Sequence, residues 1–394
     1  MVLHVKEKSK KLAAITTAAF ALPGMLPKTA MAQSAPEDYE VSYRYNKYQE
    51  GDGTQGGVSV PRYDIDIHQL AVVAPISSRL AFSLDAASES MSGASPWFIT
   101  QNSDNEAVVN FSGATIEEER NDVSIAANYY LDNARIGVSI ANSTEFDYES
   151  NSISLSTGLL FNDKNTTLDF GLSFSDDVVE PTQDTIDPGR VLEEDKESVS
   201  FFTGFSQIIN KNLLLGGGFS YGRNTGFLSD PYKLVSVDGG LLRDSRPDER
   251  EQVSVEARAR RFLPSLYAAL HADYRYYTNT WGVDSHTLSL GWYQNFASWQ
   301  PSLRVRLYDQ SEANFFNNFF TEERADGYYS SDYRLSTYSA VSVKAGLTKK
   351  VSFGSLHLSY ENYTTGESFI DSDADLSPAL VEYDLISLGF NVHF

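Results

Sequence analysis

The last nine residues of the chain alternate strictly between large apolar side chains and small or polar ones. The apolar set is Ile386, Leu388, Phe390, Val392 and Phe394, and the set between them is Ser387, Gly389, Asn391 and His393. A period of two is typical of a β-strand that places one set on each face. At ~3.3 Å per residue and a tilt of ~40°, nine residues rise roughly 23 Å, close to the ~25 Å apolar band of a membrane-spanning barrel. An edge strand of a soluble sheet has the same pattern, so the rest of the chain must separate the two interpretations.

The same alternation recurs along the chain and predicts sixteen strands, of which residues 152–161 are one of the clearest. Short turns are expected near residues 76, 132, 163, 211, 263, 297 and 349. Long loops are expected near residues 55, 103, 187, 236, 320 and 371, with smaller ones near 148 and 282. A β-bulge is expected in 352–363, because Phe353 and Leu356 break the alternation there. We therefore predict an all-β fold, a closed antiparallel transmembrane β-barrel with short periplasmic turns and long extracellular loops.

The first 32 residues have the composition of a cleaved secretory signal peptide. Lys6, Lys8, Lys10 and Lys11 precede an apolar run at 12–26, and Ala30-Met31-Ala32 supplies a cleavage site. We predict export, with residues 33–394 forming one barrel domain.

The overall composition narrows the possible partners and chemistry. A net charge of −22 disfavours nucleic acid as a partner, since phosphate would be repelled. The absence of cysteine excludes disulfides, cysteine metal sites and thiol nucleophiles. The 23 tyrosines, 23 phenylalanines and 4 tryptophans fit the aromatic girdles that flank the apolar band of a barrel.

Charged side chains fall mostly on the opposite faces of the predicted strands, where they would line the lumen. The predicted lumen-lining residues are Asp64, Asp66, Glu256, Arg258, Arg260, His271, Asp273, Arg275, Arg304 and Arg306, with His68 and Asp85 on the first strands. The same charges facing lipid would cost roughly 2–4 kcal/mol each near the midplane. A basic wall inside a pore would favour anionic or zwitterionic solutes. An interior salt-bridge network that plugs the barrel would use the same residues, and the sequence does not separate the two.

Motifs for catalysis, cofactors and metals are not found. There is no G-x-S-x-G elbow, H-E-x-x-H or phosphate-binding loop, and the six histidines are scattered. Asp284, Ser285 and His286 are adjacent, but neighbouring strand residues point to opposite faces. The segment Asp371–Asp375 has alternating oxygens without the glycine and distal glutamate of a calcium loop, and is expected to be a solvated acidic loop. We expect no catalytic residue, cofactor or metal site.

Several motifs resemble those of an exported bacterial family of unknown function that is presumed to form outer-membrane barrels. They include residues 92–96 (Ser92, Gly93, Ser95, Pro96), 226–233 (Asp230, Pro231, Tyr232), 246–250 (Pro247, Asp248), 274–277, 281–287 and 304–310. The chain has Asn279-Thr280 before Trp281-Gly282, where the family motif usually has Asp and Ser. The terminal strand also resembles the closing strand of outer-membrane barrels, in which a final aromatic residue such as Phe394 is read by the insertion machinery.

The resemblance implies a location and a fold, but no activity. The expected partners are outer-membrane lipid, lipopolysaccharide and the outer-membrane assembly machinery. The function that we expect is a channel or transporter for small polar solutes, with anionic ones favoured by the arginines. The alternatives are a loop-plugged barrel with a docking or structural role and, less favoured, a barrel enzyme. We also expect the loops near Ser92 and Asp230 to fold into the mouth and contact Arg275, Arg304 and Arg306.

Overall fold

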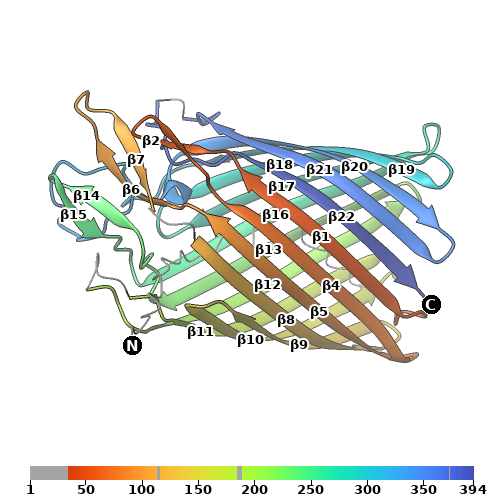
Figure 1. The fold of residues 1–394 in the computed structure, drawn as a ribbon. Helices are drawn as coiled ribbons and strands as arrows, with labels where there is room; N and C mark the ends of the chain where they lie inside the picture. The colour runs from red at the N-terminus through yellow and green to blue at the C-terminus, as the bar shows by residue number, and fades with distance from the viewer. Residues whose placement is uncertain (1–33, 113–115, 184–188, 372) are drawn as a thin grey trace, which may run out of the picture.

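Sixteen antiparallel strands form a closed barrel in the computed structural model, which describes residues 34–112, 116–183, 189–371 and 373–394 (Figure 1). The barrel strands are β1 (Glu40–Glu50), β4 (Asp64–Ser77), β5 (Leu80–Gly93), β8 (Ile116–Tyr130), β9 (Ala134–Thr144), β10 (Tyr148–Phe161), β11 (Thr166–Val179), β12 (Glu194–Asn210), β13 (Leu213–Gly226), β16 (Glu249–Leu263), β17 (Ala268–Asn279), β18 (Asp284–Gln294), β19 (Trp299–Gln310), β20 (Tyr338–Val351), β21 (Gly354–Gly366) and β22 (Tyr383–His393). The fold class predicted from the alternation is confirmed. The predicted signal peptide lies outside the described residues. Among those residues, no helix is long and apolar enough to span a membrane.

The barrel closes where β22 pairs with β1 along its whole length, from Tyr383↔Glu50 to His393↔Glu40. Beyond the last pair, Tyr39 and Phe394 exchange backbone hydrogen bonds of 3.0 and 3.1 Å, and their rings stack 5.9 Å apart. The C-terminus therefore lies at the short-turn rim, opposite the long loops (Figure 1).

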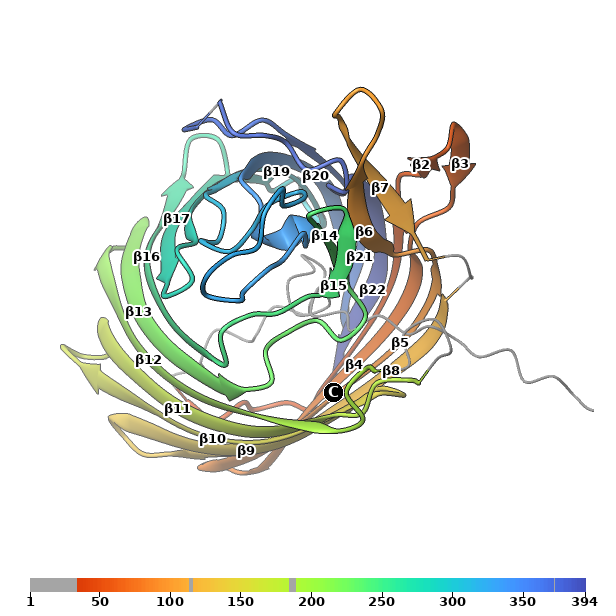
Figure 2. The ribbon, with the colours of Figure 1, turned by 90° about the vertical axis from the view of Figure 1, so that its left-hand side faces the viewer.

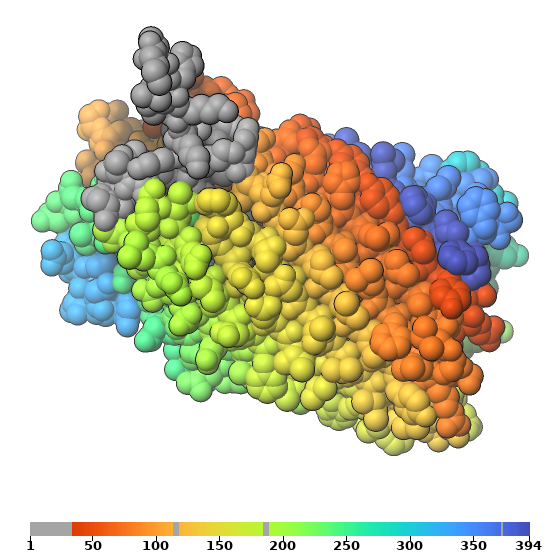
Figure 3. Space-filling view, turned by 60° about the horizontal axis from the view of Figure 1, so that its bottom comes forward, coloured from red at the N-terminus to blue at the C-terminus, as the bar shows by residue number. Residues whose placement is uncertain are grey.

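The outward face of the barrel carries the apolar side chains of the alternating pattern. On β9 and β10, Ile136, Val138 and Ile140 are exposed beside Ile153 and Leu155 of the paired strand. In the space-filling view, the strands of the N-terminal half form one continuous curved wall (Figure 3). Exposure of this many large apolar side chains requires an apolar surrounding, which for a closed barrel is lipid.

The phase of the alternation differs from the prediction at the start of β4. Asp64 and Asp66 share the outward face with Leu70, where Lys47 of β1 forms ion pairs with both carboxylates. Ile65 and Ile67 point inward and pack with Tyr48, Tyr63, Met91 and Leu385. Residues 70–74 are apolar on both faces, so the sequence does not show which face of β4 points outward. The predicted lumen position of Asp64, Asp66 and His68 is therefore wrong, and these residues lie on the outward face.

The predicted bulge in residues 352–363 is also wrong. Strands β20 and β21 pair without a register shift from Ser339↔Gly366 to Val351↔Gly354. Phe353 lies in the two-residue turn between them, so the strict alternation begins only after it. The break in the alternation at Phe353 therefore marks the turn and not a bulge.

The long loops form a folded structure at one rim, which we call the cap and define as residues 51–63, 94–112, 227–248, 311–337 and 367–382. It contains three hairpins, β2–β3 (Gly53–Gln55, Val58–Val60), β6–β7 (Pro96–Gln101, Ala107–Phe111) and β14–β15 (Leu234–Val237, Gly240–Arg243), and the 3-10 helix η2 (Tyr333–Leu335). Seen along the barrel, β14–β15 and residues 311–337 lie inside the ring of strands, whereas β2–β3 lies outside it (Figure 2). The mouth is therefore partly covered from within.

We predict that Val138→Arg destabilises the folded barrel and that Ser139→Arg does not. Val138 points outward near the middle of β9, where an arginine in lipid costs about 2–4 kcal/mol, whereas Ser139 points to the lumen. The measurement is the temperature at which the folded band disappears from unboiled SDS gels of protein refolded in lipid. Equal losses for the two variants, or a larger loss for Ser139→Arg, would contradict the assigned faces.

Candidate functional site

The lumen and its cap form the candidate site. The structure places the remaining predicted lumen residues on the inward face, on four strands: Asp85 on β5, Glu256, Arg258 and Arg260 on β16, His271, Asp273 and Arg275 on β17, and Arg304 and Arg306 on β19. Each alternates with an exposed outward residue such as Val255, Tyr274 or Leu303. The charged wall is therefore a consequence of strand register.

Only some of these arginines have a carboxylate partner. Arg258 lies 2.5 Å from Glu256, and Arg260 lies 2.6 Å from Asp273. By contrast, Arg304 donates to the Tyr293 hydroxyl at 2.7 Å, and the Arg275 guanidinium lies over the Tyr277 ring at 5.8 Å.

Arg306 also lacks an acidic partner. It makes no hydrogen bond or ion pair with any residue that the structure describes. Arg275, Arg304 and Arg306 thus carry positive charge that no carboxylate within ion-pair distance neutralises.

The wall opposite β19 is lined by small hydroxyl side chains. Strands β9–β11 lie across the ring from β18–β20 (Figure 2). Their inward residues include Ser139, Ser152, Ser154, Ser156, Ser173 and Ser175. Ser154 donates to Ser173 at 2.9 Å across the β10–β11 pair. Arg135, Asp169 and Asp177 lie on the same inward face, and each is in an ion pair. The lumen therefore has one wall rich in arginine and one that is mainly serine with paired charges.

Two segments of the cap are joined by a buried ion network. Arg246 of residues 227–248 binds Asp244 at 2.6 Å and Asp332 of residues 311–337 at 3.0 Å. Arg334 binds Asp332 at 2.5 Å and Asp230 at 3.0 Å. The side chains of Asp244 and Asp332 are completely buried. Removal of one member would leave a buried charge without its partner.

The electrostatics of this network stabilise the charged form of Asp332, whereas burial disfavours the charged forms of Asp244 and Lys233. Burial alone would raise the pKa of Asp332, but Arg334 and Lys233 hold it well below its ordinary value. Burial raises the pKa of Asp244, and Arg246 opposes that shift. Burial lowers the pKa of Lys233, which Asp332 opposes.

Backbone hydrogen bonds reinforce the contact between these two cap segments. Ser245 and Tyr329 exchange bonds of 2.9 and 2.8 Å, and Phe320 donates to the Ser236 carbonyl at 2.8 Å. Val235 and Val237 pack with Tyr329 in a small buried cluster. The two segments thus behave as one folded unit.

The motif at residues 92–96 joins the same assembly. Ser92 and Gly93 end β5, and Gly93 has φ +134 with no room for a Cβ, which would lie 2.3 Å from the Arg62 carbonyl oxygen. Ser95 donates its backbone N–H to the Ser112 hydroxyl at 3.1 Å. The Pro96 carbonyl accepts a hydrogen bond from buried Lys233 Nζ at 2.9 Å.

The other motif residues also hold cap elements together. The Pro231 carbonyl accepts from Arg190 Nε at 3.1 Å, and the Tyr232 hydroxyl donates to Asp147. The Asp248 carbonyl accepts from the Gly226 backbone at 2.9 Å. Pro247 is half-buried beside Asp248.

The loops near Ser92 and Asp230 do fold at the mouth, but their predicted contacts are wrong. Asp230 meets Arg334, and both loops meet through Lys233 and Pro96. Within the described chain, Arg275, Arg304 and Arg306 form no hydrogen bond or ion pair with the cap. The loops contain arginines of their own, Arg246 and Arg334, which the sequence pattern did not indicate as site residues.

Three carboxylates that sequence reasoning missed come together at the long-loop rim. Oxygens of Glu118, Glu145 and Asp147 all lie within 4.8 Å of one another, and they are the group in the described residues that could hold a metal ion. Burial raises the pKa of Glu145 to about 7. The β8–β9 register, which pairs Asn121 with Thr144, puts Glu118 opposite Asp147 when extended by three residues. Extending the register of this hairpin is the sequence signal that could have predicted the cluster.

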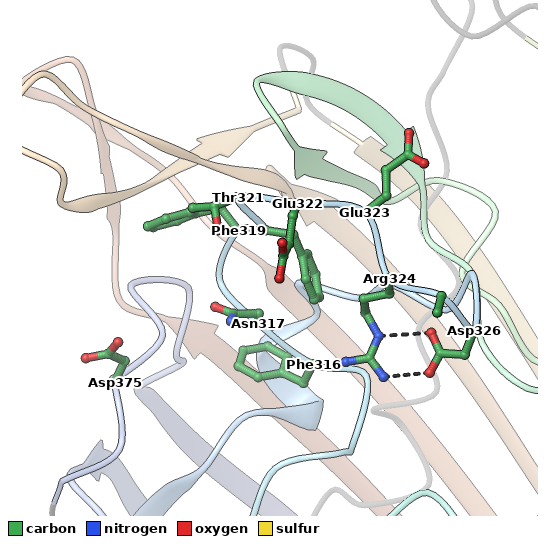
Figure 4. A pocket seen from close by; sticks show the side chains of 11 residues that line it. Phe316, Asn317, Phe319, Thr321, Glu322, Glu323, Arg324, Asp326 and Asp375 are labelled. Carbon is green, nitrogen blue, oxygen red and sulfur yellow. Dashed lines mark hydrogen bonds and ion pairs between the residues drawn. The ribbon is translucent and has the colours of Figure 1, made fainter.

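A pocket in the cap has a volume of about 860 Å³ and is lined by residues 316–317, residues 319–326 and Asp375. Phe316 and Phe319 lie on one side, and Arg324 is paired with Asp326 at 2.6 Å (Figure 4). Its acidic residues are exposed, and its arginine is already neutralised. It offers a shallow surface with no free cationic group.

The adjacent residues Asp284, Ser285 and His286 do not assemble into a catalytic group. Ser285 is buried on the inward face, whereas His286 is on the outward face with its Nδ1 2.7 Å from the Tyr274 hydroxyl. In the acidic segment 371–375, the structure describes every residue except the one at position 372.

A closed sixteen-stranded barrel with an apolar exterior, a polar interior and a capped mouth defines the class of transmembrane β-barrels. The chain belongs to the family described as "Protein of unknown function (DUF3570)", which matches residues 12–368. No curated protein sequence matches this chain.

Solved structures that resemble the chain are barrels of outer-membrane proteins. CdiB from Acinetobacter baumannii superimposes with a TM-score of 0.50 at 9% identity, covering 91% of this chain and 60% of its own. A bacterial polysaccharide outer membrane secretin gives 0.48 at 10% identity, covering 90% and 98%. OccAB3 from Acinetobacter baumannii gives 0.42 at 7% identity, covering 91% and 99%. At these identities the likeness concerns the fold.

We predict that Asp332→Ala opens the cap while the barrel stays folded. The change removes the buried carboxylate that Arg246 and Arg334 share and leaves each with one partner, Asp244 and Asp230. Breaking a buried pair costs about 3–5 kcal/mol, which corresponds to at least a hundredfold larger population of the open cap. Limited proteolysis of residues 227–248 and 311–337 measures the opening, and resistance of the barrel to unheated SDS confirms folding. Asp326→Ala, at a more exposed pair, is the control, and equal cleavage of the two variants would contradict the prediction.

Proposed function

We propose that the protein is an outer-membrane channel that passes small polar solutes and favours anions. The observation that carries the proposal is the set of three lumen arginines, Arg275, Arg304 and Arg306, that have no carboxylate partner in the described chain. The strands across the ring carry mainly serines on their inward face, and the carboxylates of Asp169 and Asp177 there are paired with Arg135 and Lys196.

The expected size of this effect is sufficient for selectivity. A unit charge about 8 Å from a permeating anion contributes about 0.5 kcal/mol at the dielectric constant of water and about 2 kcal/mol at an effective value of 20. Three arginines on β17 and β19, which are separated by one strand, therefore attract anions by several-fold over cations. Paired arginines such as Arg258 and Arg260 add much less, because their carboxylates lie within 2.6 Å.

The cap limits what reaches this wall. Residues 227–248 and 311–337 lie inside the ring of strands and are held by buried ion pairs (Figure 2). Such a constriction favours small solutes over large ones and gives the channel a fixed entrance.

The same cap supports a second candidate function. A cap that fills the mouth would make the barrel non-conducting, with a structural or docking role in the cell envelope. The buried network of Asp230, Asp244, Arg246, Asp332 and Arg334 favours this alternative, because its rigidity disfavours spontaneous opening. Conductance of the reconstituted protein separates the two functions.

The cellular setting follows from the barrel and its closing strand. The proposed partners are outer-membrane lipid and lipopolysaccharide around the barrel, and the assembly machinery that would read the terminal strand ending at Phe394. Phe394 is 70% exposed at the short-turn rim and remains accessible for that contact.

We predict that replacing Arg275, Arg304 and Arg306 together by glutamine reduces anion selectivity several-fold. The neutral amide keeps a polar side chain of similar length while removing the unpaired charge. The measurement is the reversal potential of the protein in a planar bilayer under a tenfold gradient of potassium chloride.

The control for this experiment is Arg261→Gln, because Arg261 points outward at the short-turn end of β16. It should leave the reversal potential unchanged. A protein that never conducts would exclude the channel and favour the capped structural barrel. A conducting protein whose triple variant keeps its selectivity would exclude the arginines as its source.

A further inference from the structure

The carboxylate cluster at the long-loop rim is buried, and most of its oxygens lack a partner. Glu118 ends the inward face of β8, and Glu145 and Asp147 form the loop between β9 and β10. Glu118 and Asp147 are each 95% or more shielded from solvent. The Glu145 side chain is 4% exposed.

Four of the six oxygens have no hydrogen-bond partner. Both oxygens of Glu118 are unpartnered, as are Oε2 of Glu145 and Oδ1 of Asp147. The other oxygen of Glu145 lies 3.6 Å from Arg120, and the other oxygen of Asp147 accepts from the Tyr232 hydroxyl. Glu145 and Asp147 thus each have one oxygen held by a neighbouring side chain, and Glu118 has none. Every one of the three carboxylates keeps at least one oxygen without a hydrogen-bond partner.

The charge around these oxygens is unbalanced. Arg120 lies 3.6 Å from Glu145, and it also binds Asp122 at 3.1 Å. Glu89 is paired with Arg120 in the β5–β8 register and adds another acidic group to the same face. A buried carboxylate without a cation or hydrogen bond is strongly disfavoured, so this arrangement calls for an additional positive ligand.

We propose that Glu118, Glu145 and Asp147 form a calcium site. Calcium binds carboxylate oxygens at about 2.3–2.6 Å, so two oxygens on one ion lie at most about 5 Å apart. The observed limit of 4.8 Å among the three carboxylates satisfies this condition. All three ligands are hard oxygens without nitrogen or sulfur, and a free Glu118 can bind through both oxygens, which suits calcium better than the octahedral magnesium ion.

The site would connect three parts of the protein. Glu118 belongs to the barrel wall, Glu145 and Asp147 to the β9–β10 loop, and Tyr232 brings in the cap segment 227–248. Arg190 lies over the Tyr232 ring at 4.7 Å and extends the contact to the β11–β12 loop. Calcium would therefore fasten the cap to the N-terminal half of the wall. This inference does not depend on the channel function.

The test is calcium titration by calorimetry of protein refolded in detergent without lipopolysaccharide, after treatment with EDTA and its removal. We expect about one ion per chain with a dissociation constant on the order of 10⁻⁴–10⁻³ M, as in extracellular sites. Glu118→Gln and Asp147→Asn should weaken binding at least tenfold. Glu119→Gln changes an exposed neighbour on β8 and should bind like the unmodified protein.

Stability without calcium gives a second readout. Because Glu118→Gln removes one of the crowded charges, this variant should melt no lower than the unmodified protein in EDTA, and calcium should no longer raise its melting temperature. A carboxylate with only a structural role would instead lose stability with and without calcium, which would overturn the proposal. Unchanged binding in both carboxylate variants, equal affinity for magnesium, or no saturable binding by the unmodified protein would overturn it too. The last measurement needs no variant to fold.

Discussion

The structure depends on satisfying every backbone hydrogen bond of the membrane-embedded strands by closing the sheet. In lipid, an unpaired strand edge has no water to bind, so a sheet is tolerated there only when its first and last strands meet. The full-length pairing of β1 with β22 provides this closure, and the contact of Tyr39 with Phe394 extends it to the rim. Once the sheet is closed, the period of two determines which side chains meet lipid and which meet the lumen.

The cap follows a different physical rule from the barrel wall. Its segments lie outside the apolar band, where water is present, and they have small hydrophobic clusters and buried ion pairs of their own. The Arg62 guanidinium and the Lys233 ammonium each lie 5.8 Å from the centroid of the Tyr333 ring, so this side chain connects its own cap segment to two others. A folded cap of this kind keeps the mouth in one arrangement, which allows both selective passage and closure.

The barrel could be predicted from the sequence because its signal is local. Alternation marks the strands, and turn residues mark the short connections. The interpretation was wrong where the signal is ambiguous: residues 70–74 are apolar on both faces, so Asp64 and Asp66 were assigned to the wrong side. Contacts between long loops could not be predicted, because Arg246 and Asp332 are far apart in sequence. The cluster of Glu118, Glu145 and Asp147 could have been predicted, since it follows from extending the register of one hairpin.

The most direct test of the central claim is a scan of single cysteines along β10, in a chain that has no native cysteine. Each position is labelled with a water-soluble maleimide in intact bilayers, and a fluorescent label at the same position is tested for quenching by brominated lipid. The account predicts that Ser152, Ser154 and Ser156 react from water and that Ile153 and Leu155 are quenched by lipid. Uniform reactivity, or the opposite pattern, would contradict a closed barrel with its apolar face toward lipid.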